Sequence, residues 1–202
     1  MSTRELTPRR GGAVARSLAA VAVVTALAIL GAVGVLWWQR DDAPALAGER
    51  LTSFPAVDRN GLDDTQIRIL DVLRQEFADP GEGPKYAEGV DEAWCADFVS
   101  WVMREAGRPL ANPNSGSWRI PGVYTLTDYY RAEGRFEAPG YRAKTGDVVL
   151  YADSSPFNQH TNIVIAAEAD TITTVGGNEF GGITIHRYVP ADVNGLVGYG
   201  RL

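Results

Sequence analysis

The chain has 202 residues, 45% of them hydrophobic and 22% charged, which suits one globular domain with an additional segment. Residues 1–40 hold five arginines and one glutamate, so the net charge of −6 leaves −10 for residues 41–202. An acidic surface of this kind argues against nucleic-acid binding, which requires basic patches.

The first predicted element is an apolar run over residues 18–38, in which Thr25 is the one mildly polar residue. Its length matches the roughly 20 residues that an α-helix needs to cross a bilayer. Arginines precede the run, so the positive-inside rule keeps residues 1–17 in the cytoplasm and exports the rest of the chain. We therefore predict a cytoplasmic tail, a single-pass transmembrane signal anchor at 18–38 and a linker over 39–62. The alternative is secretion after signal cleavage near Ala47, which the length of the apolar run disfavours.

The remaining residues, 63–202, are predicted to form one α+β domain. Apolar residues at helical spacing predict three helices, over residues 65–77, 94–107 and 123–132. Strand-type patterns follow, over residues 147–151, 162–167, 171–175, 183–189 and 196–202. Helices first and strands after indicate N-terminal helices packed on an antiparallel sheet.

The only cysteine, Cys95, is predicted to lie in the first turn of the second helix. Unpaired backbone N–H groups and the positive end of the helix dipole both favour a thiolate there, and the thiolate is the nucleophilic form. The alternative is a small buried hydrophobic residue, which is the usual environment of a free cysteine. An unpaired cysteine in an exported protein favours the reactive thiol.

A base for this thiol is predicted on the hairpin of the second and third strands. If Ala167 faces Thr171 across its turn, counting back along both strands places His160 opposite Asn178. Directly opposed residues share a face, with Cβ atoms about 4.5–5.5 Å apart. A thiol nucleophile needs a base and an orienting group, so Cys95, His160 and Asn178 are the predicted catalytic residues. A slip of one residue in the register would break this arrangement.

Several stretches of the sequence resemble the landmarks of a CHAP domain, a cysteine, histidine-dependent amidohydrolase or peptidase. They are Lys85-Tyr86, Ala93 to Trp101, Gly146 to Val149, His160 to Val164, and Gly176-Gly177-Asn178. The resemblance covers about residues 63–202 and implies a papain-like core related to that of NlpC/P60 hydrolases.

The resemblance implies Cys95 as nucleophile, His160 as general base and acid, and Asn178 as the orienting residue. Some family members place an acidic residue two positions before the asparagine, where this chain has Gly176. The neighbouring Glu179 is expected to point to the opposite face of a regular strand.

The family commonly cleaves peptidoglycan, so we expect a cell-wall hydrolase that cleaves an amide bond in stem peptides or cross-bridges, as an amidase or an endopeptidase. The alternatives are a catalytically inactive CHAP-like module that binds the envelope, and a thiol acyltransferase or amidase with a non-wall substrate. Tyr86, Trp94 and Trp118 are the predicted substrate-binding residues. No cofactor or metal is expected, because one cysteine and two histidines on separate strands do not suit a zinc site. The second histidine, His186, is predicted to be an ordinary strand residue.

Overall fold

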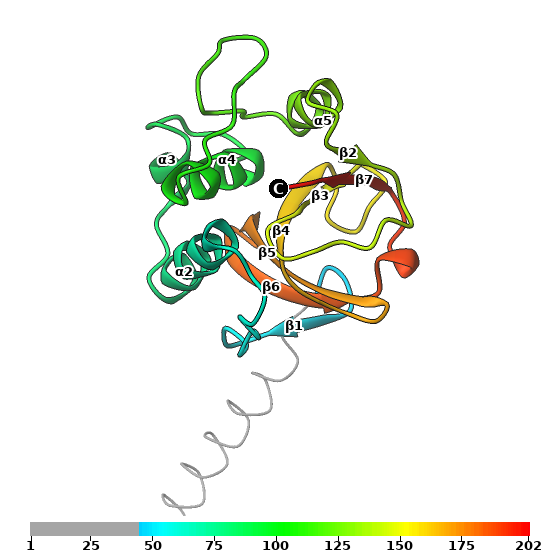
Figure 1. The fold of residues 1–202 in the computed structure, drawn as a ribbon. Coiled ribbons are helices and arrows are strands. Elements are labelled where there is room, and N and C mark those ends of the chain that lie inside the picture. Colours follow the sequence, from blue (N-terminus) through cyan, green and yellow to red (C-terminus); the bar gives the residue numbers. More distant parts are fainter. Residues whose placement is uncertain (1–44) are drawn as a thin grey trace, which may run out of the picture. The chain divides into compact units, whose positions relative to one another are not determined.

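The computed structural model describes residues 45–202 (Figure 1). The predicted cytoplasmic tail, the predicted transmembrane anchor at 18–38 and the start of the predicted linker lie outside the described residues. Within residues 45–202, no helix is both long and apolar enough to cross a membrane.

The described part of the chain contains four α-helices, all before the main run of strands. They are α2 (Asp64–Ala78), α3 (Gly83–Tyr86), α4 (Cys95–Glu105) and α5 (Val123–Ala132). Helix α2 begins at a capping box, in which the Asp63 side chain accepts hydrogen bonds from the backbone N–H groups of Thr65 and Gln66. Helix α4 ends in a Schellman motif, because Gly107 has φ +76° and Arg108 N–H donates to the Met103 carbonyl at 2.8 Å.

A sheet of seven strands follows, and every pairing within it is antiparallel. The strands are β1 (Glu49–Leu51), β2 (Phe136–Glu137), β3 (Val148–Tyr151), β4 (His160–Glu168), β5 (Thr171–Glu179), β6 (Gly182–Tyr188) and β7 (Leu196–Gly200), and a 3₁₀ turn spans Pro190–Asp192. Their order in the sheet is β1-β6-β5-β4-β3-β7-β2. The predicted α+β class with an antiparallel sheet is confirmed for residues 45–202.

The described end of the predicted linker packs against the domain. Residues 45–202 form one compact unit, and β1 within them pairs with β6 so that Arg50 lies opposite His186. The prediction that residues 39–62 are a linker is therefore wrong for β1. Sequence patterns do not predict this strand, because a three-residue edge strand that begins with Glu49 and Arg50 is too short and polar to show strand periodicity.

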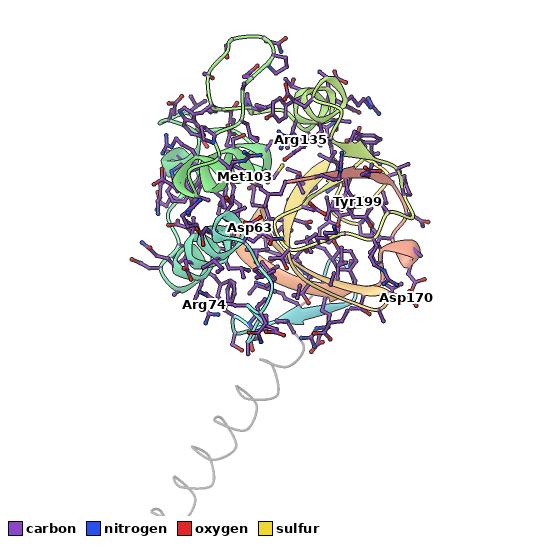
Figure 2. All side chains as sticks on the ribbon, in the orientation of Figure 1. Asp63, Arg74, Met103, Arg135, Asp170 and Tyr199 are labelled. Atoms are coloured by element: carbon purple, nitrogen blue, oxygen red, sulfur yellow. The ribbon has the colours of Figure 1, made fainter. Side chains whose placement is uncertain are left out.

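Alternating strand residues form two hydrophobic cores on opposite faces of the sheet. Ile163 and Ile165 of β4 pack in the same core as α4, whereas Val164 belongs to a second core with Tyr199 of β7. Helices α2, α3 and α4 lie to one side of the strands (Figure 1), and Figure 2 labels Met103 of α4 and Tyr199, one residue from each core. Helix α4 packs on β4 and β5, the two strands that carry the predicted base and orienting residue.

Candidate active site

Cys95 is the first residue of α4, as the sequence predicts. The residue before it, Trp94, is the N-cap and makes no side-chain capping hydrogen bond. The first backbone N–H groups of the helix therefore lack a side-chain acceptor at the end where the thiol lies. Cys95 is buried, with 6% of its surface exposed, so the thiol belongs to a largely enclosed site.

His160 is the first residue of β4 and lies within hydrogen-bond reach of the Cys95 thiol. Its Nε2 atom is 2.9 Å from the Oε1 atom of Glu179, so the nitrogen that remains for the sulfur is Nδ1. The imidazole thus lies between a thiol and a carboxylate. The structure brings together two of the three predicted catalytic residues and gives the histidine a different acidic partner.

The orienting residue differs from the predicted Asn178, because β5 contains a bulge. The predicted pair of Ala167 and Thr171 is wrong, because Glu168 lies opposite Thr171; a bulge between Val164 and Ala166 then brings Ile163 opposite Val175, as the predicted register requires near the site. Against β6, however, the register shifts by one residue between Gly176 and Glu179, and Asn178 adopts φ +60°. An extra residue in a strand reverses the faces that follow it, so Glu179 takes the place expected for Asn178.

The pKa values of His160 and Glu179 shift in opposite directions. Burial lowers the pKa of His160, but hydrogen bonds to Cys95 and Glu179 outweigh this effect and raise it to about 9. Burial raises the pKa of Glu179, but hydrogen bonds from His160 and His186 outweigh this effect and lower it to about 2. At neutral pH the pair is therefore an imidazolium against a carboxylate.

The second oxygen of the Glu179 carboxylate is held by β6. The Thr184 hydroxyl donates to Oε2, and the Nδ1 atom of His186 lies 3.1 Å from the same oxygen. Glu179 is 2% exposed, and each of its oxygens has a partner. A buried carboxylate with this number of partners has a fixed orientation, which is what an orienting residue requires.

Two glycines leave room for this arrangement. A Cβ atom on Gly176 would overlap the Oε1 atom of Glu179 and lie 3.1 Å from the Nε2 atom of His160. A Cβ atom on Gly177 would lie 2.5 Å from the Trp94 ring. Position 176, where some family members carry an acid, is thus occupied in space by the carboxylate of Glu179.

Phe157 is a further contributor that the sequence analysis missed. Its ring stacks on the His160 ring with centroids 5.5 Å apart and an interplanar angle of 12°, and it meets His186 edge to face. Phe157 is buried although it lies in the polar loop before β4. Phe157 is the one aromatic residue in that loop, which was the available signal in the sequence. Its packing restrains the plane of the His160 imidazole.

Two of the predicted substrate-binding residues are core residues in this structure. Tyr86 is fully buried, donates to the Glu76 carboxylate at 2.6 Å and stacks on Trp94 with centroids 5.0 Å apart. Burial and the bond to Glu76 raise the pKa of the Tyr86 phenol. Trp94 is 6% exposed. Both aromatic rings pack against Phe98 in the first turns of α4, and neither ring has an exposed face.

Trp118 is half-buried and lies against the opposite end of α4. Its ring centroid is 4.0 Å from the Arg104 guanidinium carbon. Arg104 follows Cys95 by nine residues, which places it about 13 Å further along the helix axis. The recorded contact of Trp118 is therefore with a side chain from the last turn of α4, whereas Cys95 begins the helix.

A buried ion pair fastens the loop after α4 to the first turn of that helix. The Arg119 Nε atom donates to Asp97 Oδ1 at 2.7 Å, and the same guanidinium also pairs with Glu92. Asp97 is fully buried, and its Oδ2 atom has no hydrogen-bond partner within residues 45–202. Burial raises the pKa of Asp97 to about 6, although Arg119 opposes this shift. The pair fixes the loop beside the helix end that carries Cys95.

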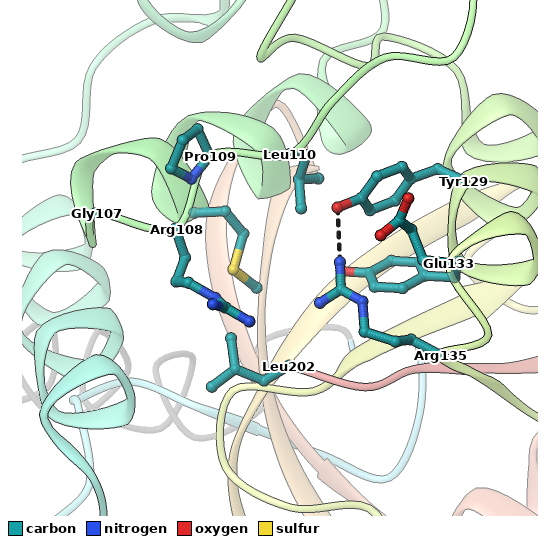
Figure 3. A pocket seen from close by; sticks show the side chains of 10 residues that line it. Gly107, Arg108, Pro109, Leu110, Tyr129, Glu133, Arg135 and Leu202 are labelled. Atoms are coloured by element: carbon teal, nitrogen blue, oxygen red, sulfur yellow. Dashed lines mark hydrogen bonds between the residues drawn. The ribbon is translucent and has the colours of Figure 1, made fainter.

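A pocket of about 520 Å³ lies at the far end of α4 (Figure 3). Its wall includes Met103, Arg108 and Arg135, and the Arg135 guanidinium donates to the Tyr129 hydroxyl at 2.6 Å. Met103 follows Cys95 by eight residues, about 12 Å along the helix. None of the predicted site residues lines this pocket, so it is separate from the candidate active site.

A thiol at a helix start, facing a histidine on an antiparallel sheet, is the arrangement of a papain-like cysteine amidohydrolase or peptidase. Residues 85–178 match the family model of the CHAP domain. This match confirms the resemblance to a CHAP domain seen in the sequence. The match includes Cys95 and His160 and ends one residue before Glu179. A search of curated proteins and a search of solved structures found no match.

Proposed function

We propose that this domain is a cell-wall hydrolase that cleaves an amide bond of peptidoglycan, as an amidase or an endopeptidase. The family is generally hydrolytic and commonly acts on this substrate. The observation that carries the proposal is the position of His160, which lies beside the Cys95 thiol and pairs with the Glu179 carboxylate at 2.9 Å. A thiol, a base and an orienting carboxylate form the machinery of a thiol hydrolase.

In the first half of the reaction, the Cys95 proton already lies on Nδ1 of the His160 imidazolium, and the sulfur attacks the amide carbonyl carbon as the thiolate. The carbonyl oxygen becomes an oxyanion, for which the free backbone N–H groups at the start of α4 are the available donors. The C–N bond then breaks, and His160 gives its proton to the leaving amine. The product of this half is a thioester on Cys95.

In the second half, His160 takes a proton from water and the hydroxide attacks the thioester. The C–S bond breaks, the carboxylic acid leaves, and the proton taken from water stays on His160 beside the Cys95 thiolate, which restores the starting state. We assign the orienting role to Glu179 in place of Asn178, because an acceptor on Nε2 keeps Nδ1 directed at the sulfur.

Digestion of purified peptidoglycan sacculi tests the proposal. The full-length chain should release soluble fragments whose masses identify the cleaved bond, and Cys95→Ala should release none. Cys95→Ser is the matched variant, because it replaces the thiol with a hydroxyl group of similar shape and so lacks the sulfur nucleophile. Fragment release by Cys95→Ala at the wild-type rate would refute the thiol mechanism.

The same assay separates the alternatives. Binding to sacculi without fragment release by the wild-type chain would favour the inactive envelope-binding module. Transfer of an acyl group to an added amine, with no hydrolysis of sacculi, would favour an acyltransferase.

We further propose that the apolar run at residues 18–38 anchors the chain in the cell membrane, with the domain outside the cytoplasm. The support is the positive-inside pattern and the location of the proposed substrate. Protease added outside spheroplasts should degrade the domain and spare the N-terminal tail. N-terminal sequencing of the mature protein would show instead a start near Ala47 if the segment is cleaved.

A further inference from the structure

His186 is a second buried histidine that the proposed reaction does not use. It lies in β6 with no exposed surface, and its Nδ1 atom is 3.1 Å from the Oε2 atom of Glu179. Its other ring nitrogen, Nε2, accepts a hydrogen bond from the backbone N–H of Leu46 at 3.2 Å. One imidazole thus joins the orienting carboxylate to the segment that precedes β1.

These two contacts determine the tautomer of His186. The Leu46 amide donates, so Nε2 must be the unprotonated nitrogen. The ring proton then lies on Nδ1 and is donated to the Glu179 carboxylate, with the Thr184 hydroxyl 3.3 Å from the same nitrogen. The other tautomer would place the Nδ1 lone pair against the carboxylate, so the Leu46 amide selects the form that holds Glu179.

The segment that supplies this amide is packed into the domain. Ala47 is buried in the second core, and Leu46 packs against that core. Gly48 adopts φ +55°, and a side chain there would overlap the Arg187 carbonyl on β6, so the segment lies directly against that strand. Pairing of β1 with β6 continues this contact.

We propose that His186 is a positioning residue for the Glu179 carboxylate, and that the docked Leu46 amide keeps His186 in the required form. The proposal deepens the function proposed above and rests on it. The polar contacts run from Leu46 through His186 and Glu179 to His160, which lies beside Cys95. The state of the segment that leads toward the predicted membrane anchor is thereby coupled to the catalytic imidazole. Cleavage after Ala47 would remove the Leu46 donor.

Variants of His186 test the first link, with fragment release from sacculi as the activity. His186→Leu removes the donor to a charged acceptor and should lower the maximal rate roughly 10- to 100-fold with little change in the half-saturating sacculus concentration. His186→Asn places an amide N–H₂ near the position of Nδ1 and should restore most of this loss. Arg187→Ala, on the neighbouring exposed position of β6, is the matched control and should have the wild-type rate.

The pH profile gives a readout that a purely structural role would not move. His186 helps to lower the pKa of Glu179, so its loss should shift the acid limb of the rate profile to higher pH. The other titratable groups facing Glu179 are His160 and the buried phenols of Tyr151 and Tyr188, whose raised pKa values keep the phenols neutral across the assay. An unchanged acid limb in His186→Leu would overturn the proposal.

A double-mutant cycle tests the second link. Leu46→Pro removes the backbone N–H, whereas Leu46→Ala keeps it and alters only the side chain. Leu46→Pro should lower the rate about two- to tenfold in the wild-type background, since one hydrogen bond is lost. It should have no further effect in His186→Leu, which has no acceptor for that N–H. Equal effects in both backgrounds would show that the segment acts without His186 and would overturn the coupling.

The outcomes distinguish the two proposals. Activity in Cys95→Ala would refute the proposed thiol hydrolase function, and the role of His186, which rests on that function, would be refuted with it. Loss of activity in Cys95→Ala together with a wild-type rate in His186→Leu would overturn only the role of His186. Melting temperatures of all variants identify any rate loss that comes from unfolding.

Discussion

The Nε2 atom of His160 lies 2.9 Å from the Oε1 atom of Glu179, in a buried pair whose two pKa values move in opposite directions. The carboxylate stays charged down to about pH 2, and the imidazole stays charged up to about pH 9. Over the range between these values the orienting group carries its charge, and the pH dependence of the enzyme should follow from this pair.

The first prediction concerns the alkaline limb of the rate profile. The leaving amine takes its proton from His160, so activity should fall as pH rises through about 9, where the imidazolium is lost. Glu179→Gln removes the negative charge that helps to raise this pKa, so the limb should move down toward the ordinary histidine value of about 6.5. The measurement is the initial rate of fragment release from sacculi between pH 5 and pH 10. A limb that stays near 9 in Glu179→Gln would show that the carboxylate does not act on His160.

The second prediction decides between Glu179 and Asn178 as the orienting residue. Asn178→Gly keeps the positive φ of the bulge without strain, so it should cost less activity than Glu179→Gln, which removes the charged acceptor of His160. We expect a loss of roughly 10- to 100-fold for Glu179→Gln, the value of a hydrogen bond to a charged group. Rates on sacculi provide the comparison, and the opposite order of the two variants would restore the role predicted for Asn178.

Two of the three candidate site residues could be predicted from the sequence, whereas the orienting residue, Glu179, could not. The periodicity of α4 and the position of His160 were enough to place the thiol and its base, because both depend on local patterns. The face on which Glu179 lies depends on a single extra residue in β5, and strict alternation gives the wrong face once that residue is present. A signal was available, because Gly176-Gly177-Asn178 combines two glycines with a residue that tolerates positive φ, which is typical of a bulge.

Other parts of the fold could not be predicted either, because they depend on contacts between residues that are far apart in the sequence. Helix α5 spans the predicted 123–132, since its amphipathic pattern is local. Strands β1 and β2 have three and two residues and exist because β6 and β7 present edges for them to pair with. The hydrogen bond from Leu46 to His186 joins residues 140 positions apart, and no local pattern predicts such a contact.

The third prediction concerns the space reserved for the Glu179 carboxylate. Gly176→Ala places a methyl group where Oε1 lies, so the carboxylate must move away from His160. Overpacking of this kind should cost about 1–3 kcal/mol of stability, and the rate on sacculi should fall at least as far as in Glu179→Gln. Gly182→Ala is the matched control, since no atom lies within 4 Å of a methyl group there. Thermal unfolding and rates measure both effects, and a fully active Gly176→Ala would contradict the placement of the carboxylate.

The fourth prediction concerns the ion pair of Asp97 and Arg119 beside the first turn of α4. Arg119→Ala leaves a fully buried carboxylate without its cation, which should cost about 3–5 kcal/mol near pH 8. The pKa of Asp97 is already raised to about 6 by burial and rises further without Arg119. A raised carboxyl pKa means that stability is lost as pH rises through the folded-state value, so the variant should be less impaired at pH 5, where Asp97 is protonated.

Melting temperatures of the wild type and Arg119→Ala at pH 5 and pH 8 measure this difference. The matched control is Arg131→Ala, whose pair with Asp128 is exposed on both sides and should contribute less than about 1 kcal/mol at either pH. The difference in melting temperature between the wild type and Arg119→Ala should grow from pH 5 to pH 8, while the difference for Arg131→Ala stays small. Equal losses for Arg119→Ala at the two pH values would mean that its effect comes from lost packing of the loop rather than from the charge of Asp97.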